Sequence, residues 1–84
     1  MPSTNASRAQ RRSAREHLAG NLVLMRRERG WSQEDLALEA GLHRTFVAHV
    51  ERGARNISLD NIEKLAIVLG VETYCLLRPS SSTE

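Results

Sequence analysis

The sequence predicts an all-α protein of five helices, and three observations support this fold class. Apolar residues recur at the spacing of helices that bury one face. Ser residues precede several of these segments and Gly residues follow them, which is typical of helix starts and ends. Only five Gly and two Pro interrupt the 84 residues, and aromatic residues make up 4%, which disfavours a sandwich or barrel. A chain of this length forms one domain.

The first helix is predicted to start after Ser13 and to stop at Gly30. Ser13 and Glu16 have the spacing of a capping box, in which the hydroxyl accepts from a backbone amide and the carboxylate reaches back. The apolar face of this helix then follows at helical spacing, as Leu18, Leu22 and Met25.

The second and third predicted helices are short and are joined by a turn at Gly41. Ser32 caps the second helix, while Glu34 and Asp35 lie in its first turn, at the positive end of the helix dipole. Gly41 is expected to have a positive φ angle. The third helix is predicted over Arg44 to Arg52. The positions expected to face the core are Leu36, Ala37 and Ala40 in the second helix, and Val47 and Val50 in the third.

Two further helices complete the predicted fold. Residues 54–57 form a loop, Ser58 caps the fourth helix, and Gly70 ends it. Residues 72–78 form a short fifth helix, which stops before Pro79. The fourth helix places five apolar residues at core spacing: Leu59, Ile62, Leu65, Ala66 and Leu69.

Basic residues gather near the N-terminus, although the net charge of the whole chain is only +2. Residues 1–15 contain Arg8, Arg11, Arg12 and Arg15 and no acidic residue, whereas the other 8 basic residues are outnumbered by 10 acidic ones. Such an arm favours a polyanionic partner, and a solvated tail explains it equally well. We therefore divide the chain into a flexible basic arm (1–15), a helical domain (16–78) and a flexible tail (79–84).

The composition disfavours several classes of protein. Cys75 is the single cysteine, so neither an intrachain disulfide nor a thiolate metal cluster can form, and a lone thiol fits a reducing cytoplasm. The longest apolar run, residues 65–69, is far shorter than the roughly 20 residues of a membrane span, and no signal peptide is present. No nucleophile triad, phosphate-binding glycine loop or carboxylate pair indicates an enzyme. We expect a soluble cytoplasmic protein without a cofactor or bound metal.

Residues 32–53 have the organisation of a helix-turn-helix, with two short helices around a glycine turn. Apolar residues would hold these helices at a steep angle, and Ala37 is small enough to let them approach. The second helix can then enter a DNA major groove, which is about 12 Å wide. Because any helical hairpin has this spacing, the pattern alone does not establish DNA binding.

The residues of this segment are more specific than their spacing. Ser-Gln-Glu-Asp-Leu-Ala at 32–37, His-Arg-Thr-Phe-Val at 43–47 and Val-Glu-Arg-Gly at 50–53 resemble the Cro and phage-repressor (XRE) family of transcriptional regulators. The resemblance covers residues 17–78 and extends, through residues 44–47 and the Arg55-Asn56 pair, to controller proteins of restriction–modification systems. It implies a five-helix, lambda-repressor-like domain that binds paired half-sites as a dimer.

This resemblance implies how DNA would be contacted. Gln33, at the start of the second helix, would hold a phosphate. Arg44 would bind O6 and N7 of guanine or else a phosphate, and Thr45 would meet a base edge or a thymine methyl group. His43 and His49 would touch DNA or simply lie on the surface, and they point to different sides of the helix, so they are not metal ligands. The expected DNA-binding residues are Gln33, His43, Arg44, Thr45, Phe46, Ala48, His49, Arg52, Arg55 and Asn56, with phosphate contacts from Arg8, Arg11, Arg12 and Arg15 of the arm.

Other residues are expected to stabilise the domain or its dimer. Family counterparts of Arg26 and Glu51 form a buried ion pair between the first and third helices. The last two helices carry more apolar residues than the core needs, Leu76 among them. These residues imply a dimer contact, and a tighter monomeric core would use the same side chains. The expected dimer residues are Ile67, Val68, Val71, Tyr74 and Leu77.

The sequence thus predicts a homodimeric regulator that binds specific sites in double-stranded DNA. It would regulate by occupancy, either by blocking RNA polymerase or by touching it. The alternative is an antitoxin-type module that masks a toxin protein and regulates its own operon, because the same fold serves that role.

Overall fold

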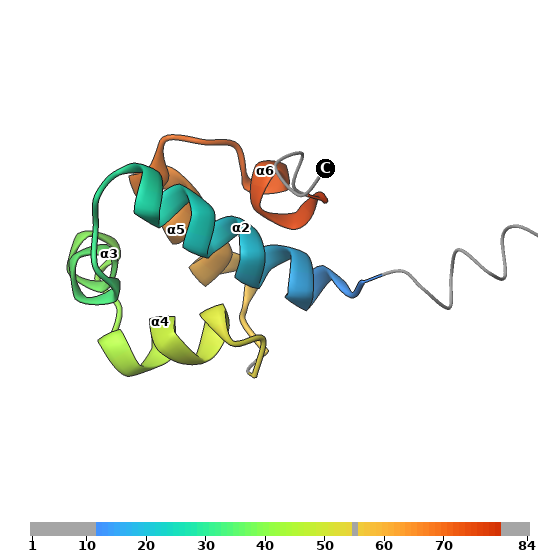
Figure 1. Ribbon diagram of the computed structural model, residues 1–84, viewed down its shortest axis with the longest axis horizontal. Helices are drawn as coiled ribbons and strands as arrows, with labels where there is room; N and C mark the ends of the chain where they lie inside the picture. The colour runs from blue at the N-terminus through green and yellow to red at the C-terminus, as the bar shows by residue number, and fades with distance from the viewer. Residues whose placement is uncertain (1–11, 55, 80–84) are drawn as a thin grey trace, which may run out of the picture.

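The computed structural model describes residues 12–54 and 56–79, and these residues fold into five α-helices without any strand (Figure 1). The all-α fold class is therefore confirmed. None of the helices in these residues has the length and apolar content that a membrane span requires. The helices are α2 (Ala14–Glu28), α3 (Gln33–Ala40), α4 (Arg44–Glu51), α5 (Leu59–Leu69) and α6 (Thr73–Leu77).

The main contacts between helices form a closed ring. α2 packs against α4 and α6, α3 packs against α4 and α5, and α5 packs against α6. Figure 1 shows α2 running along the molecule, with α3 and α6 toward its opposite ends. Every helix contributes at least one large side chain that is almost completely buried in the centre. These side chains are Leu18, Leu22, Leu36, Val47, Val50, Leu65 and Leu76.

The helices begin and end at the residues that local chemistry predicts. At the start of α2, the backbone N–H of Glu16 donates to Ser13 Oγ at 3.1 Å, and the Ser13 N–H donates to Glu16 Oε1 at 2.8 Å. Ser32 and Ser58 cap α3 and α5 through their hydroxyl groups. Gly41 ends α3 with a φ of 70°, a left-handed conformation that strains residues with a Cβ. These predictions are confirmed. The sequence could make them because each depends only on neighbouring residues.

Two leucines lie where the sequence analysis did not expect them. Leu59 was expected in the core, and its side chain is 73% exposed. It is the first residue of α5, and helical side chains tilt toward the N-terminus, so it projects beyond the helix end. Ile57, two residues earlier, packs against the core instead. Leu76 was counted as surplus to the core, yet it is fully buried where α6 closes the ring.

Two side chains from the α2 region hold the ends of α5 and α6. The buried Asn21 donates from Nδ2 to the carbonyl oxygens of Leu76 and Arg78, at 2.9 and 2.7 Å. Arg29, directly after α2, donates from Nη2 to the carbonyl oxygen of Leu69. The last carbonyl groups of a helix have no partner within it, so these bonds satisfy them. They therefore fix both C-terminal helices on α2.

Candidate nucleic-acid interface

α3 and α4 form a rigid two-helix unit. Leu36 and Val47 are fully buried between the helices and the core, and Ala37 is buried beside them. The backbone N–H of Leu42 donates to the carbonyl oxygen of Ala37 at 2.8 Å, which closes the turn after Gly41. The predicted helix-turn-helix is present, and its apolar side chains fix the direction in which α4 points.

The first turn of α4 faces solvent. His43, Arg44 and Thr45 are all exposed, and the turn contains no acidic residue. His43 is the N-cap residue, and its side chain makes no capping hydrogen bond. The backbone amides at a helix start carry partial positive charge, to which Arg44 adds a full one. This end of α4 therefore suits an anionic partner.

The remaining expected contacts of α4 are partly covered. Phe46, Ala48 and His49 are half-buried, and Phe46 packs against the hydrophobic core. The aromatic ring of Phe46 thus helps to hold α4 in place. Because the residue is only half-buried, part of its surface is still open to a ligand. Thr45 and Ala48 lie three residues apart, so they share one face of the helix.

A hydrogen-bonded network joins α2, α3 and α4 through one carboxylate. Glu51 accepts from Arg26 Nε at 2.6 Å and from Arg26 Nη2 at 2.9 Å, so the ion pair that the family resemblance implied is present. Gln33 Nε2 donates to Glu51 Oε1 at 2.9 Å. Because a carboxylate only accepts, Gln33 must turn its NH₂ group and not its oxygen toward Glu51. The ion pair therefore also orients the side chain that starts α3.

The ion pair is largely shielded from water. The side chains of Arg26 and Glu51 are only 10% and 4% exposed, and Arg26 Nη1 also donates to the carbonyl oxygen of Trp31 at 2.9 Å. The hydrogen bond to Glu51 raises the pKa of Arg26 further above its usual value. The guanidinium therefore remains charged, and the two partners depend on each other.

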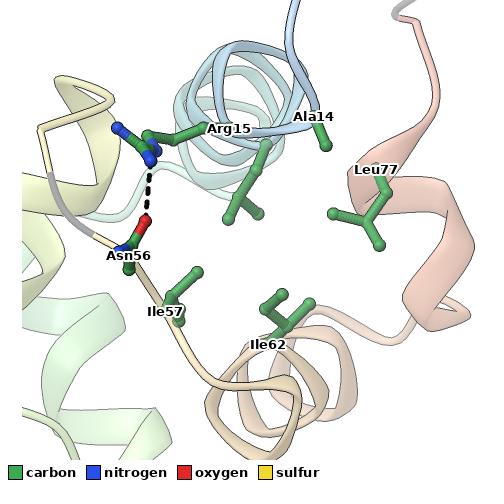
Figure 2. Close-up of a pocket in the computed structure, with 7 residues that line it drawn as sticks. Ala14, Arg15, Asn56, Ile57, Ile62 and Leu77 are labelled. Carbon is green, nitrogen blue, oxygen red and sulfur yellow. Dashed lines mark hydrogen bonds between the residues drawn. The ribbon is translucent and has the colours of Figure 1, made fainter.

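The loop between α4 and α5 contains further expected contacts. Arg52 and Asn56 are exposed, while Arg55 lies outside the described residues. Arg15 Nη2 donates to Asn56 Oδ1 at 2.6 Å, which joins the start of α2 to this loop (Figure 2). Arg15 falls within the predicted flexible arm (1–15), but the cap at Ser13 starts α2 before it, so Arg15 has a fixed place on a helix.

The two arm arginines that the structure describes, Arg12 and Arg15, lie in different places. Arg12 is exposed and lines a hollow with Ala14, His17, Leu77 and Pro79, beside the end of α6. Arg15 instead lies at the loop after α4. Arg8 and Arg11 lie outside the described residues. Arg12 and Arg15 therefore do not form one cluster of positive charge.

The expected dimer residues divide into two kinds. Ile67 and Tyr74 are 70% and 63% exposed, so both place apolar surface in solvent. Val68, Val71 and Leu77 are partly buried and pack against the core. Of the expected dimer residues, Ile67 on α5 and Tyr74 on α6 therefore have the apolar surface that is available to a partner.

Two polar links within this region were not identified from the sequence. They are the hydrogen bond of Gln33 to Glu51 and that of Arg15 to Asn56, whose partners are 18 and 41 residues apart in the chain. No local spacing connects such pairs. The sequence marked all four residues for DNA contact or ion pairing, but it carried no signal that they bind one another.

A family model described as helix-turn-helix matches residues 22–74, which include α3, α4 and α5. A hypothetical transcription factor of Neisseria meningitidis is 56% identical over 62 residues. The match covers 74% of this chain, and the chain spans only 58% of that relative's length. These findings confirm the family resemblance drawn from the sequence.

Solved structures agree with these sequence matches. The restriction–modification controller protein C.AhdI from Aeromonas hydrophila superposes with a TM-score of 0.71 at 45% identity, over 74% of this chain and 94% of the other. The biofilm regulator SinR, solved in complex with DNA, gives a TM-score of 0.70 at 31% identity, over 73% of this chain and 98% of the other. The likeness therefore extends to a regulator captured on DNA.

Proposed function

The chain belongs to the XRE-type helix-turn-helix family of DNA-binding transcription regulators, and we propose that it acts as a homodimer on paired half-sites in double-stranded DNA. The observation that carries this proposal is the exposed, cationic first turn of α4, held on a rigid two-helix unit. A helix presented in this way can enter a major groove while the buried side chains keep its direction constant.

Base recognition belongs to Arg44 and Thr45 in this proposal. The planar guanidinium of Arg44 donates two parallel hydrogen bonds to O6 and N7 of a guanine. Thr45 offers a hydroxyl and a methyl group to the neighbouring base pair. The small Ala48 side chain lets α4 approach the groove closely, and His43 and His49 contact the DNA around these two readers.

Contacts to the DNA backbone surround the reading helix. Gln33 donates one N–H to Glu51, so the second N–H of the same amide is oriented for a phosphate. The backbone amides at the start of α3 favour the same anion. Arg52 and Asn56, which follow the last turn of α4, donate to further phosphates. Arg55 and the arginines of the arm add to these phosphate contacts. These contacts position α4 and make the affinity sensitive to salt.

The dimer forms through α5 and α6. Ile67 and Tyr74 expose apolar surface that a second copy would bury, while Val68, Val71 and Leu77 lie at the edge of the core. A symmetric contact of this kind presents two copies of α4. Two such helices enter successive major grooves when they lie roughly 34 Å apart.

In this proposal, the dimer regulates transcription through the position of its binding site on the DNA. C.AhdI is a controller protein of a restriction–modification system. We extend that role to this chain as a regulator that binds upstream of genes, its own included. Occupancy there either blocks RNA polymerase or brings it to the promoter.

A DNA titration tests the proposal. The full chain is titrated against its own upstream region and against a scrambled duplex of equal length, at two salt concentrations. We expect tighter binding to the upstream duplex and a steep loss of affinity with salt, because each phosphate contact releases counterions. Weak and equal binding to both duplexes would contradict the proposal. Co-purification of a stable protein partner would then favour the toxin-masking alternative.

A further inference from the structure

We propose that Arg15 is a positioning residue for DNA binding, which holds the side chain of Asn56 in the orientation that meets the DNA backbone. The inference rests on the proposed function, and it assigns to Arg15 a role in place of the direct phosphate contact that was expected of it. Its basis is the hydrogen bond from Arg15 Nη2 to Asn56 Oδ1, at 2.6 Å.

This bond lies at the edge of a hollow behind the loop. The hollow has a volume of about 350 Å³, and its walls are mostly apolar. Figure 2 shows Ile57 and Ile62 on one side, Ala14 and Leu77 on another, and the Arg15–Asn56 bond spanning from α2 to the loop. Side chains that border an open hollow lack contact atoms on that side, so packing restrains this part of the loop less. A direct hydrogen bond to α2 supplies the missing restraint.

The bond also decides which way the Asn56 amide points. An arginine only donates, so Arg15 must meet the oxygen of the amide and not its nitrogen. The Nδ2 group of Asn56 is then turned away from Arg15. A phosphate only accepts, so this orientation is the one that allows Asn56 to donate to DNA. Without Arg15, the amide is free to rotate and to present its oxygen to the phosphate.

One consequence separates a positioning role of Arg15 from simple attraction of DNA by its charge. A bare charge at Arg15 would attract DNA whether or not residue 56 can donate. A positioning residue loses its effect when Asn56 is absent, because it has nothing left to orient. The effects of removing the two side chains should therefore overlap and not add.

The test is a double-mutant cycle on the full chain, with Arg15→Ala, Asn56→Ala and both changes together. Binding to the upstream duplex and to a scrambled duplex is measured by fluorescence anisotropy. We expect each single change to weaken binding to the upstream duplex about tenfold, as for one charge-assisted or well-oriented hydrogen bond. We expect the double variant to bind within about twofold of Asn56→Ala alone.

Arg12→Ala is the matched control, because it removes the same charge three residues earlier, beside α6 and not beside the loop. Its effect on binding should add in full to that of Asn56→Ala. The ¹⁵N NMR signal of the Asn56 side-chain amide gives an independent readout, and it should shift in Arg15→Ala and stay unchanged in Arg12→Ala. Thermal melting of each variant verifies that it is folded.

The outcomes distinguish this inference from the proposed function. Full additivity of Arg15→Ala and Asn56→Ala, in a chain that prefers the upstream duplex, would overturn the positioning role and leave the function intact. An unshifted Asn56 amide signal in Arg15→Ala would also overturn it. Failure of the wild-type chain to prefer the upstream duplex would overturn the function, and the positioning role with it.

Discussion

The first turn of α4 and the α5–α6 pair present different kinds of surface. On the first turn of α4, the exposed side chains are polar or charged, and the apolar residues of the unit that hold the two helices together are buried. On α5 and α6, Ile67 and Tyr74 place large apolar side chains in solvent. The difference underlies the proposal of two partners of different chemistry: an anionic one for α4 and an apolar one for α5 and α6.

The two regions are also held in different ways. Glu51 ties α3 and α4 to α2 through a buried ion pair and the Gln33 amide. Asn21 and Arg29 tie α6 and α5 to α2 by donating to helix-end carbonyl groups. A carboxylate accepting from two side chains fixes side-chain direction as well as helix position. The Gln33 amide at the start of α3 is therefore oriented before any ligand arrives.

Breaking the ion pair should have the largest effect. Arg26→Ala leaves the buried Glu51 carboxylate without its partner, and we expect the free energy of unfolding to fall by about 3–5 kcal/mol. Arg27→Ala is the control, because Arg27 is the next residue on α2 and is exposed. Its cost should stay below about 1 kcal/mol. Urea denaturation measures both, and equal small losses would show that the pair is not the main link between α2 and α4.

The second change acts on the apolar surface. Ile67→Glu puts a charge where a second copy would pack, and we expect light scattering to report a monomer. Affinity for DNA should fall roughly 100-fold, because one chain then holds one half-site without its linked partner. Leu38→Glu is the matched control for the molecular mass, since Leu38 is 78% exposed but lies on α3, and this variant should remain a dimer. A dimeric mass for Ile67→Glu would exclude this face as the dimer contact.

The third change separates base recognition by Arg44 from phosphate contact by Arg52. Arg44→Ala should reduce the ratio of upstream to scrambled affinity by about 5- to 150-fold, which corresponds to about 1–3 kcal/mol of base discrimination. Arg52→Ala should weaken binding to the upstream and the scrambled duplex by the same factor, because a phosphate contact carries no sequence information. If Arg44→Ala keeps the wild-type ratio, Arg44 does not read a base.

The smallest effect is expected from the arm. Deleting residues 1–11 removes Arg8 and Arg11 but leaves the Ser13 cap and α2 in place. The slope of log affinity against log salt should become shallower by about 2, one unit for each lost phosphate contact. An unchanged slope would show that these arginines do not contact DNA.

Local chemistry made most of the fold predictable. Ser13, Ser32 and Gly41 set helix ends through contacts with residues three or four positions away, and such contacts are visible in a sequence. The core positions of α2, α3 and α4 followed from the helical period. Leu59 and Leu76 did not, because the exposure of Leu59 depends on where α5 begins and the burial of Leu76 on how α6 closes the ring.

The candidate site was predictable to a smaller extent. The family resemblance named Arg44, Gln33 and Asn56 as separate contacts to DNA. The bond of Gln33 to Glu51 depends on how α3 packs against α4, and that of Asn56 to Arg15 on how α2 lies beside the loop, and no residue spacing encodes either. The Arg15–Asn56 bond therefore emerged only from the folded chain.

Methylation protection of the upstream duplex tests the central claim, that the first turn of α4 reads bases in the major groove. Dimethyl sulfate methylates N7 of guanine, which lies in that groove beside the O6 atom that Arg44 is proposed to bind. We predict two patches of protected guanines about one helical turn apart, and their loss in Arg44→Ala. Guanines that remain fully reactive in the saturated wild-type complex would contradict the account.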